Sequence, residues 1–351
     1  MISWLKSKLL SAAERFIEHP RIESALRRAL PARAPASDLS FSSDALALKP
    51  YADVGGARLP DLGGGSPIFV SARFRTGSTL LWSLLRHLPN TTAFYEPLNE
   101  RRWFSSEHRG SGVDPSHRGV DDYWSEYDGL AHLERLYDPQ WTDHRLYLDQ
   151  WSNHQPLKAY IDALVDHASG RAVLQFNRAD FRLAWLRHNY PDCRIVHLYR
   201  HPREQWVSTL FGDWSFPIDG TLEQFATHDR FYLTSWVRDL QWQLAPLSNV
   251  NDKHPYLAFY VLWKLSLLIG KRYSDVSISF ESLCGDPAVQ FQRILTACSV
   301  DDSDGVAPDS VVGGLPPAKS GQYAELDWYL RWEALGDALI SGSLSRSGHQ
   351  T

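Results

Sequence analysis

Residues 67–85 read PIFVSARFRTGSTLLWSLL, and this stretch decides the fold. Residues 68–70 are a short apolar run rich in β-formers, with three glycines before it at 63–65 and a polar loop after it. This pattern predicts a buried strand at about residues 67–72. Beyond the loop, leucines recur at helical spacing, and Ser78 or Thr79 is available as the N-cap of a helix. The predicted order is therefore strand, loop, helix.

The loop covers residues 73–79, and its part Arg75-Thr76-Gly77-Ser78-Thr79 has the composition of an anion site. Backbone N–H groups point outward at a helix N-terminus, and the helix dipole favours negative charge there. Gly77 lets the backbone approach a phosphate closely, the two hydroxyls after it add donors, and Arg75 adds a fixed cation. We predict a phosphate-binding loop; the alternative is an ordinary strand-to-helix turn that happens to be basic. It is not a Walker A loop, because no G-x-x-x-x-G-K-[ST] string occurs in the chain.

Composition limits the class of protein. The 351 residues are 43% hydrophobic and 22% charged, which is typical of a globular chain able to bury a sizeable core. A net charge of −5 argues against a nucleic-acid binder. The three cysteines, Cys193, Cys284 and Cys298, have no motif spacing, so we expect neither a disulfide scaffold nor a zinc site. They fit a reducing compartment, and we expect a cytoplasmic protein.

The two ends of the chain differ from its middle. Residues 1–30 hold no apolar run long enough for a secretory signal or a transmembrane helix. Apolar residues within 1–20 make one helical face, which indicates either a membrane-surface helix or packing against the protein or a partner. We therefore predict a helical extension and linker over 1–47, an α/β domain over 48–340, and a disordered tail over 341–351.

A βα rhythm continues after the first helix. Apolar, β-branched runs predict further strands at 91–95, 172–176, 194–199 and 276–280, separated by helical segments. The fold class is therefore α/β, with a P-loop-like, three-layer arrangement of about five mostly parallel strands flanked by helices. Residues 101–170 show weak periodicity and many aromatic, His and Asp residues. We interpret them as an irregular insertion that covers or builds the acceptor site, with its histidines, His117 among them, on the solvated surface.

Glu96 follows the second predicted strand, and Pro97 stops that strand. Because ligands of open parallel sheets bind outside the carboxyl ends of the strands, Glu96 and the anion loop are expected to face one crevice. A carboxylate beside a phosphate site is costly unless it has a role or a cation partner. Pairing with Arg101 or Arg102 is the structural alternative.

A second informative stretch follows the fourth predicted strand and reads Arg200-His201-Pro202-Arg203. Pro202 suits the first position of a helix, because its missing N–H would have no partner there. Arg200 ends the strand and Ser208 lies two turns into the next helix, so both can reach one anion near the strand ends.

These segments together resemble the sulfotransferase superfamily. Residues 75–79 are similar to its 5′-phosphosulfate loop, Arg200 with Ser208 matches its 3′-phosphate signature in residue and spacing, and residues 280–287 (FESLCGDP) resemble its late strand-[YF]-E-x-L-x-x-x-P segment. The resemblance covers about residues 67–300. Y-E-P at 95–97 is closer to the carbohydrate and bacterial branch. Arg75 departs from the Lys usual in the cytosolic small-phenol branch, which keeps the charge but changes the donor geometry.

The resemblance implies a function. The donor would be 3′-phosphoadenosine 5′-phosphosulfate, bound by Arg75, Thr76, Gly77, Ser78, Thr79, Arg200 and Ser208, with Lys319 and Ser320 as candidates from a late closing loop. No metal is required. Glu96 is the candidate general base and Glu100 the second candidate. The acceptor would be a hydroxyl, expected on a carbohydrate or glycolipid. The alternatives are a P-loop-type kinase and a non-catalytic binding protein on the same scaffold.

Overall fold

The structure is a computed structural model, and it describes residues 65–115, 117, 119–212, 215–300 and 307–347. The predicted N-terminal extension and linker over 1–47, including the candidate membrane-surface helix, lie outside the described residues. So do residues 348–351 at the other end.

The core is a sheet of five parallel strands in the order β2-β3-β1-β4-β5. The strands are four to six residues long and almost wholly buried, as expected for a parallel sheet covered on both faces. The strands are β1 (Ile68–Ala72), β2 (Thr91–Tyr95), β3 (Arg171–Phe176), β4 (Arg194–Tyr199) and β5 (Val276–Ser279). The predicted fold class is confirmed, and the described sheet is wholly parallel.

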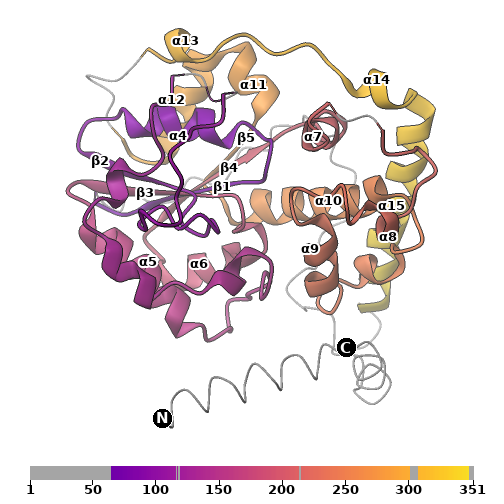
Figure 1. Cartoon of the computed structure of the whole chain (residues 1–351), viewed down its shortest axis with the longest axis horizontal. Helices are drawn as coiled ribbons and strands as arrows, with labels where there is room; N and C mark the ends of the chain where they lie inside the picture. Colours follow the sequence, from indigo (N-terminus) through magenta and orange to yellow (C-terminus); the bar gives the residue numbers. More distant parts are fainter. Residues whose placement is uncertain (1–64, 116, 118, 213–214, 301–306, 348–351) are drawn as a thin grey trace.

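Helices cover both faces of the sheet, which gives three layers (Figure 1). On one face lie α4 (Ser78–Arg86), α11 (Phe280–Gly285) and α12 (Pro287–Ala297). On the other lie α5 (Gln155–His167), α6 (Leu183–Asn189) and the long α10 (Pro255–Tyr273). Near the carboxyl edge, α7 (Pro202–Thr209) follows β4 directly, with Pro202 as its first residue as predicted.

A helical lobe extends the domain beyond the sheet (Figure 1). It contains α8 (Leu222–Phe225), α9 (Leu233–Leu240), α14 (Ser320–Tyr323) and α15 (Leu326–Ser347), and α13 (Pro308–Val311) lies near α12. Short 3₁₀ segments complete the described elements: Ser125–Tyr127, Ala131–Arg135, Pro139–Thr142, Asp180–Arg182 and Ala245–Asn249. No helix in the described ranges is both long and apolar enough to cross a membrane.

The predicted disordered tail over 341–351 is wrong for its first part, because α15 continues to Ser347. This helix packs along α10, and Gly336 allows the approach, since a Cβ there would lie 2.7 Å from the Tyr260 ring. Ile340 is 1% exposed, so the contact reaches the start of the supposed tail. The packed part of the helix ends near Ile340, and its last turns continue past that contact.

The predicted insertion over 101–170 is irregular as far as residue 154 but not beyond it. Residues 155–167 form α5, which carries the chain from β2 back to the neighbouring parallel strand β3. Parallel neighbours require such a crossover. Its buried face is Leu157, Tyr160, Ile161 and Leu164, a helical spacing that the surrounding aromatic residues obscured.

Candidate active site

The anion loop lies between β1 and α4, and two of its residues have left-handed backbone conformations. Arg75 has φ +63° and Gly77 has φ +88°. Gly77 is the N-cap of α4. The predicted N-cap at Ser78 or Thr79 is therefore wrong, because both residues lie inside the helix. The Thr76 hydroxyl donates to the Arg73 carbonyl at 2.7 Å and closes the turn. The N-terminus of α4 therefore opens at Gly77, with Ser78 and Thr79 in its first turn.

Gly77 also lies against Phe280, the first residue of α11, and a Cβ at this position would overlap the Phe280 ring. The glycine is therefore required by both the backbone conformation and the close contact. This second reason could not be predicted, because Phe280 is distant in sequence.

Gly77→Ala is expected to lower the free energy of unfolding by about 2–4 kcal/mol, because it adds backbone strain and overlap with a ring. Gly129→Ala is the matched control, since Gly129 has φ +84° but nothing within 4 Å of the added Cβ. The control should lose about 1–2 kcal/mol, from strain alone. Urea unfolding measures both; equal losses would show that the Phe280 contact adds nothing.

The structure brings the two predicted anion-binding stretches into contact. Arg75 Nε donates to Ser208 Oγ at 3.0 Å, although 133 residues separate them. One guanidinium nitrogen of Arg200 donates to the Arg75 carbonyl at 3.1 Å. Since β1 and β4 are neighbours, the loops that follow them meet at the carboxyl edge of the sheet. Two cations and one hydroxyl therefore converge beside the N-terminus of α4, which favours an anionic ligand.

Arg200 is fixed by its surroundings. Its guanidinium carbon lies 4.9 Å from the centre of the Phe280 ring, and Trp263 donates to its carbonyl at 2.9 Å. Its Nε is buried and finds no hydrogen-bond partner among the described residues. Burial lowers the pKa of Arg200, and the nearby carboxylate of Glu281 opposes that shift. A buried guanidinium with an unused donor fits a bound phosphate.

Glu281 has a structural contact at the start of α7. One carboxylate oxygen accepts from the backbone N–H of His201 at 3.0 Å, at the start of α7. Burial raises the pKa of Glu281. This hydrogen bond fixes the backbone immediately after Arg200, where α7 begins.

The late loop residues Lys319 and Ser320 approach the same end of α7. Their backbone N–H groups donate to the Glu204 carboxylate at 2.8 and 3.0 Å, at the start of α14. Glu204 interacts electrostatically with Arg200. Lys319 is exposed. The loop that carries Lys319 and Ser320 is thus anchored to Glu204, one turn along the chain from Arg200.

Glu96 follows β2 with a strained backbone. Its φ is +40°, unusual for a residue with a side chain. Three tyrosine hydroxyls from the segment between β2 and β3 secure this turn. Tyr127 donates to the Tyr95 carbonyl at 2.9 Å, Tyr160 to Pro97 at 2.7 Å, and Tyr137 to Asn99 at 2.9 Å. Strain that the surroundings enforce in this way is often found at functional sites.

The Glu96 carboxylate is 8% exposed and accepts a hydrogen bond from Asn99 Nδ2. Burial raises its pKa, while the charge of Arg178 opposes the shift. The alternative pairing with Arg102 is not found: Arg102 pairs with Glu134 at 2.6 Å. Among the described residues, Arg101 forms no ion pair with Glu96 either. The cation beside Glu96 is therefore Arg178, which follows β3.

Glu100, the second candidate base, lies in the same cluster. Its carboxylate accepts from Arg178 at 2.6 Å, and its side chain is 48% exposed. Phe74 of the anion loop connects this cluster to the loop, since the Arg178 guanidinium lies 4.9 Å from the centre of its ring. The carboxylates and the anion loop thus face one edge of the sheet, linked through Arg178 rather than by direct contact.

His117 is not the solvated surface residue that was expected. Its Nε2 lies 3.2 Å from Thr79 Oγ1, and its Nδ1 lies 2.5 Å from the Tyr123 hydroxyl. The Thr79 hydroxyl also bonds the Tyr95 hydroxyl at 2.8 Å. Burial lowers the pKa of His117, so the neutral ring is favoured. No spacing signal in the sequence points to this contact.

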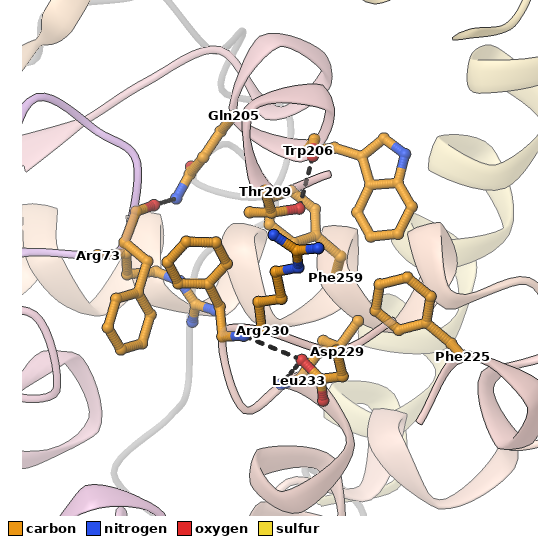
Figure 2. A pocket seen from close by; sticks show the side chains of 11 residues that line it. Arg73, Gln205, Trp206, Thr209, Phe225, Asp229, Arg230, Leu233 and Phe259 are labelled. Atoms are coloured by element: carbon orange, nitrogen blue, oxygen red, sulfur yellow. Dashed lines mark hydrogen bonds between the residues drawn. The ribbon is translucent and has the colours of Figure 1, made fainter. Parts of the chain in front are cut away.

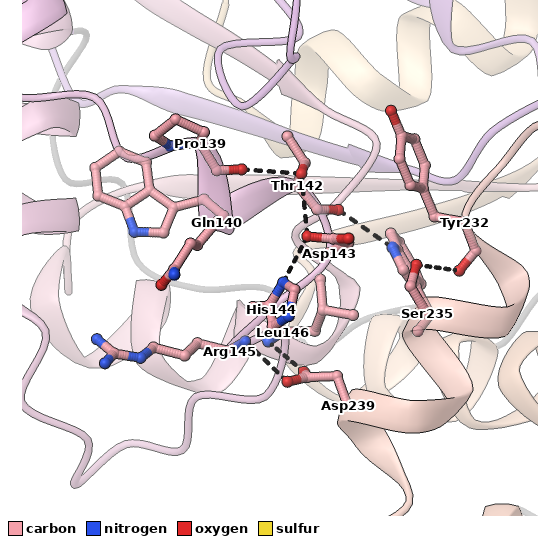
Figure 3. A network of polar contacts seen from close by, with 12 residues as sticks. Pro139, Gln140, Thr142, Asp143, His144, Arg145, Leu146, Tyr232, Ser235 and Asp239 are labelled. Carbon is pink, nitrogen blue, oxygen red and sulfur yellow. Dashed lines mark hydrogen bonds and ion pairs between the residues drawn. The ribbon is translucent and has the colours of Figure 1, made fainter. Parts of the chain in front are cut away.

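The irregular segment before α5, residues 101–154, is joined to α9 by a polar network (Figure 3). Asp239 accepts from the backbone N–H groups of Arg145 and Leu146 at 3.1 and 2.9 Å. Trp236 donates to the Thr142 carbonyl at 3.2 Å. Because Tyr232 precedes α9 as its N-cap, these contacts also set the position of Tyr232 beside the carboxylate cluster.

A small hollow lies behind the anion loop, between that loop, α7, α9 and α10 (Figure 2). Its volume is about 20 Å³, room for about one water molecule. Gln205, on its wall, donates to the Phe74 carbonyl at 2.7 Å. The hollow is too small for an acceptor, so we assign it to the support of the loop. Within the described residues, no group of three His, Cys, Asp or Glu side chains is arranged to hold a metal ion.

Comparison with known proteins identifies the family. The model of the sulfotransferase family matches residues 67–304. Because this match covers more than half of the 351 residues, the chain belongs to the sulfotransferase family. A search of curated proteins finds no match.

Solved structures that resemble the chain are sulfotransferases at low identity. One is from Alicyclobacillus acidocaldarius, with 14% identity, 81% of this chain and 99% of that chain covered, and a TM-score of 0.36. Sulfotransferase STF9 from Mycobacterium avium has 14% identity, 82% and 78% coverage, and a TM-score of 0.41. The sulfotransferase domain of the Synechococcus PCC 7002 olefin synthase has 14% identity, 82% and 95% coverage, and a TM-score of 0.33.

Proposed function

We propose that the protein transfers a sulfuryl group from 3′-phosphoadenosine 5′-phosphosulfate to a hydroxyl of an acceptor. The observation that best supports this donor is the contact of Arg75 with Ser208 at 3.0 Å, together with that of Arg200 with the Arg75 carbonyl. A donor with phosphates at both ends of its ribose needs two adjacent anion sites. Arg75 to Thr79 would take the 5′-phosphosulfate, and Arg200 with Ser208 the 3′-phosphate. Lys319 and Ser320 would close over the nucleotide.

The transfer is expected to be in-line, with a loose transition state like that of phosphoryl transfer. The bond from sulfur to the bridging oxygen breaks, and its electron pair leaves with the phosphate. The acceptor oxygen forms the new bond to sulfur, and its proton passes to the Glu96 carboxylate. Arg75 and the N-terminus of α4 would stabilise the charge that builds on the bridging oxygen. The transferred group carries less charge than a phosphoryl group, so we propose no metal.

We propose a carbohydrate or glycolipid hydroxyl as the acceptor, on the resemblance of residues 95–97 to the carbohydrate branch. The test is a screen of the purified full chain with sulfur-labelled donor against saccharides, glycolipids, phenols and alkyl alcohols. Labelled saccharide or glycolipid supports the proposal. Transfer to phenols or alcohols alone would overturn the acceptor class and keep the donor. We also propose a cytoplasmic location, which the three buried thiols support.

Arg200→Ala is expected to weaken binding of adenosine 3′,5′-bisphosphate by about 1.5–3 kcal/mol, the usual size of a charge-assisted contact. Binding of the analogue without the 3′-phosphate should change far less. Titration calorimetry with both ligands measures the difference. Equal losses for both would show that Arg200 does not recognise the 3′-phosphate.

A further inference from the structure

We propose that Arg178 is a positioning residue for the acceptor half of the site, orienting Glu100 by direct contact and supplying a buried positive charge to the turn that carries Glu96. This inference rests on the proposed function. The strand order suggests it first: the anion loop follows β1, Glu96 follows β2, and Arg178 follows β3, which lies between them. Arg178 is therefore the cation that the topology places between donor loop and candidate base.

The hydrogen bonds of Arg178 support an orienting role. One terminal nitrogen donates to Glu100 Oε2 at 2.6 Å, and the other donates to Asn177 Oδ1 at 2.8 Å. The Arg178 carbonyl accepts from Arg182 at 3.1 Å, which fixes the backbone. The side chain is 1% exposed, and its Nε is buried without a hydrogen-bond partner among the described residues. A planar guanidinium held at both terminal nitrogens has little rotational freedom, so Glu100 is held as well.

Two aromatic rings lie over the Arg178 guanidinium and help to keep it buried. The guanidinium carbon lies 4.9 Å from the centre of the Phe74 ring and 5.3 Å from that of Tyr232. Charges interact more strongly where water is excluded, so the buried Arg178 acts on the buried Glu96 more than a surface cation would. Phe74 belongs to the anion loop and Tyr232 is fixed by the segment docked on α9, so the two halves of the site meet at Arg178.

Several other titratable or charged groups face this cluster and must be considered with it. Arg178 acts electrostatically on Tyr137, Asp143, Arg182 and Tyr232 in addition to Glu96. Glu96 is faced in turn by Tyr95, Tyr123, Tyr127 and Glu100. Burial keeps the tyrosines neutral at ordinary pH by raising their pKa values. Arg178 is therefore the cation that opposes the effect of burial on Glu96.

The test compares wild type with Arg178→Gln, Arg178→Lys and Arg187→Gln. The last is a matched control, because Arg187 pairs with the buried Asp275 at 2.7 Å at the opposite edge of the sheet. The titration of Glu96 is followed by NMR of carboxyl-labelled glutamate, with the signal assigned from Glu96→Gln. Arg178→Gln should raise the proton affinity of Glu96 about tenfold or more, since it removes an adjacent opposite charge. Arg187→Gln should leave it unchanged.

Turnover supplies the second readout. Arg178→Gln should lower kcat by about 10²-fold through lost orientation, shift the acidic limb of the pH profile to higher pH, and leave bisphosphate affinity unchanged. Arg178→Lys keeps the positive charge, so the Glu96 titration should stay near that of wild type. It loses the planar guanidinium that binds Glu100 and Asn177 together, so kcat should fall. An unchanged Glu96 titration in Arg178→Gln would overturn the proposal. If that variant does not fold, wild-type turnover in Arg178→Lys would overturn it instead.

Failure of the proposed function would look different. Wild type that binds no bisphosphate nucleotide and transfers no label would reject the donor assignment. The Glu96 titration would still report on Arg178, because that readout needs no turnover.

Discussion

Glu96→Gln is expected to lower kcat by about 10²–10⁴-fold, with the affinity for adenosine 3′,5′-bisphosphate nearly unchanged. The substitution keeps the shape of the side chain and removes its basicity, and a general base typically contributes that much. Steady-state turnover with labelled donor gives kcat, and calorimetry gives the affinity. Glu126→Gln is the matched control, since burial also raises the pKa of Glu126 and Arg86 pairs with it.

The pH dependence follows from the direction of the Glu96 shift. Burial raises its pKa above the ordinary 4.5, and a general base must be deprotonated. The acidic limb of kcat should therefore lie above pH 4.5 and disappear in Glu96→Gln. The same shift has the opposite consequence for stability. Because the pKa of Glu96 is raised in the folded protein, its contribution to the free energy of unfolding is present below the pKa of the unfolded chain and is lost as the pH rises. Glu96→Gln should therefore fold at neutral pH.

Two results would reject this role for Glu96. If Glu96→Gln keeps most of its turnover while Glu100→Gln abolishes it, the base is Glu100. If Glu96→Gln fails to fold, Glu96 serves the structure of the turn that Tyr127, Tyr137 and Tyr160 hold.

Arg75→Ala is expected to lower kcat by about 10²–10³-fold, because it removes a fixed cation from the bridging oxygen where charge develops. It also removes the donor to Ser208 Oγ, so bisphosphate binding should weaken as well. Arg75→Lys restores the charge without the planar fork and should recover part of the loss. Turnover and calorimetry separate the two effects.

Arg109→Ala is the control for this prediction, since Arg109 pairs with Asp128 at the surface. It should retain wild-type turnover. Wild-type turnover in Arg75→Ala would show that Arg75 takes no part in the transfer and only supports the loop.

The sheet could be predicted from sequence because its strands are short segments rich in apolar, β-branched and aromatic residues, bounded by polar loops. Predicted and observed bounds agree closely, as at 194–199, where β4 runs from Arg194 to Tyr199. The helix α5 was missed, because its buried face lies among aromatic residues without a clear period. Contacts between distant residues could not be predicted either: α15 packs on α10 as far as Ile340, and Gly77 is required by Phe280 as well as by its own φ.

The meeting of Arg75 with Arg200 and Ser208, on the side proposed to bind the donor, could be predicted, because these residues follow neighbouring strands at fixed spacing. The acceptor side could not. Arg178 carries no motif and is recognised through Glu100, Phe74 and the position of β3 between β1 and β2. His117 reaches Thr79 from an irregular segment whose path no local pattern predicts.

The most direct test of the proposed donor is calorimetric titration of the purified full chain with adenosine 3′,5′-bisphosphate, adenosine 5′-monophosphate and Mg²⁺-ATP under one set of conditions. The contact between the anion loop and the Arg200–Ser208 pair predicts that the bisphosphate binds most tightly, by about tenfold or more, since a charge-assisted contact contributes about 1.5–3 kcal/mol. Binding of Mg²⁺-ATP as tight as that of the bisphosphate, or tighter, would contradict the account and favour a kinase.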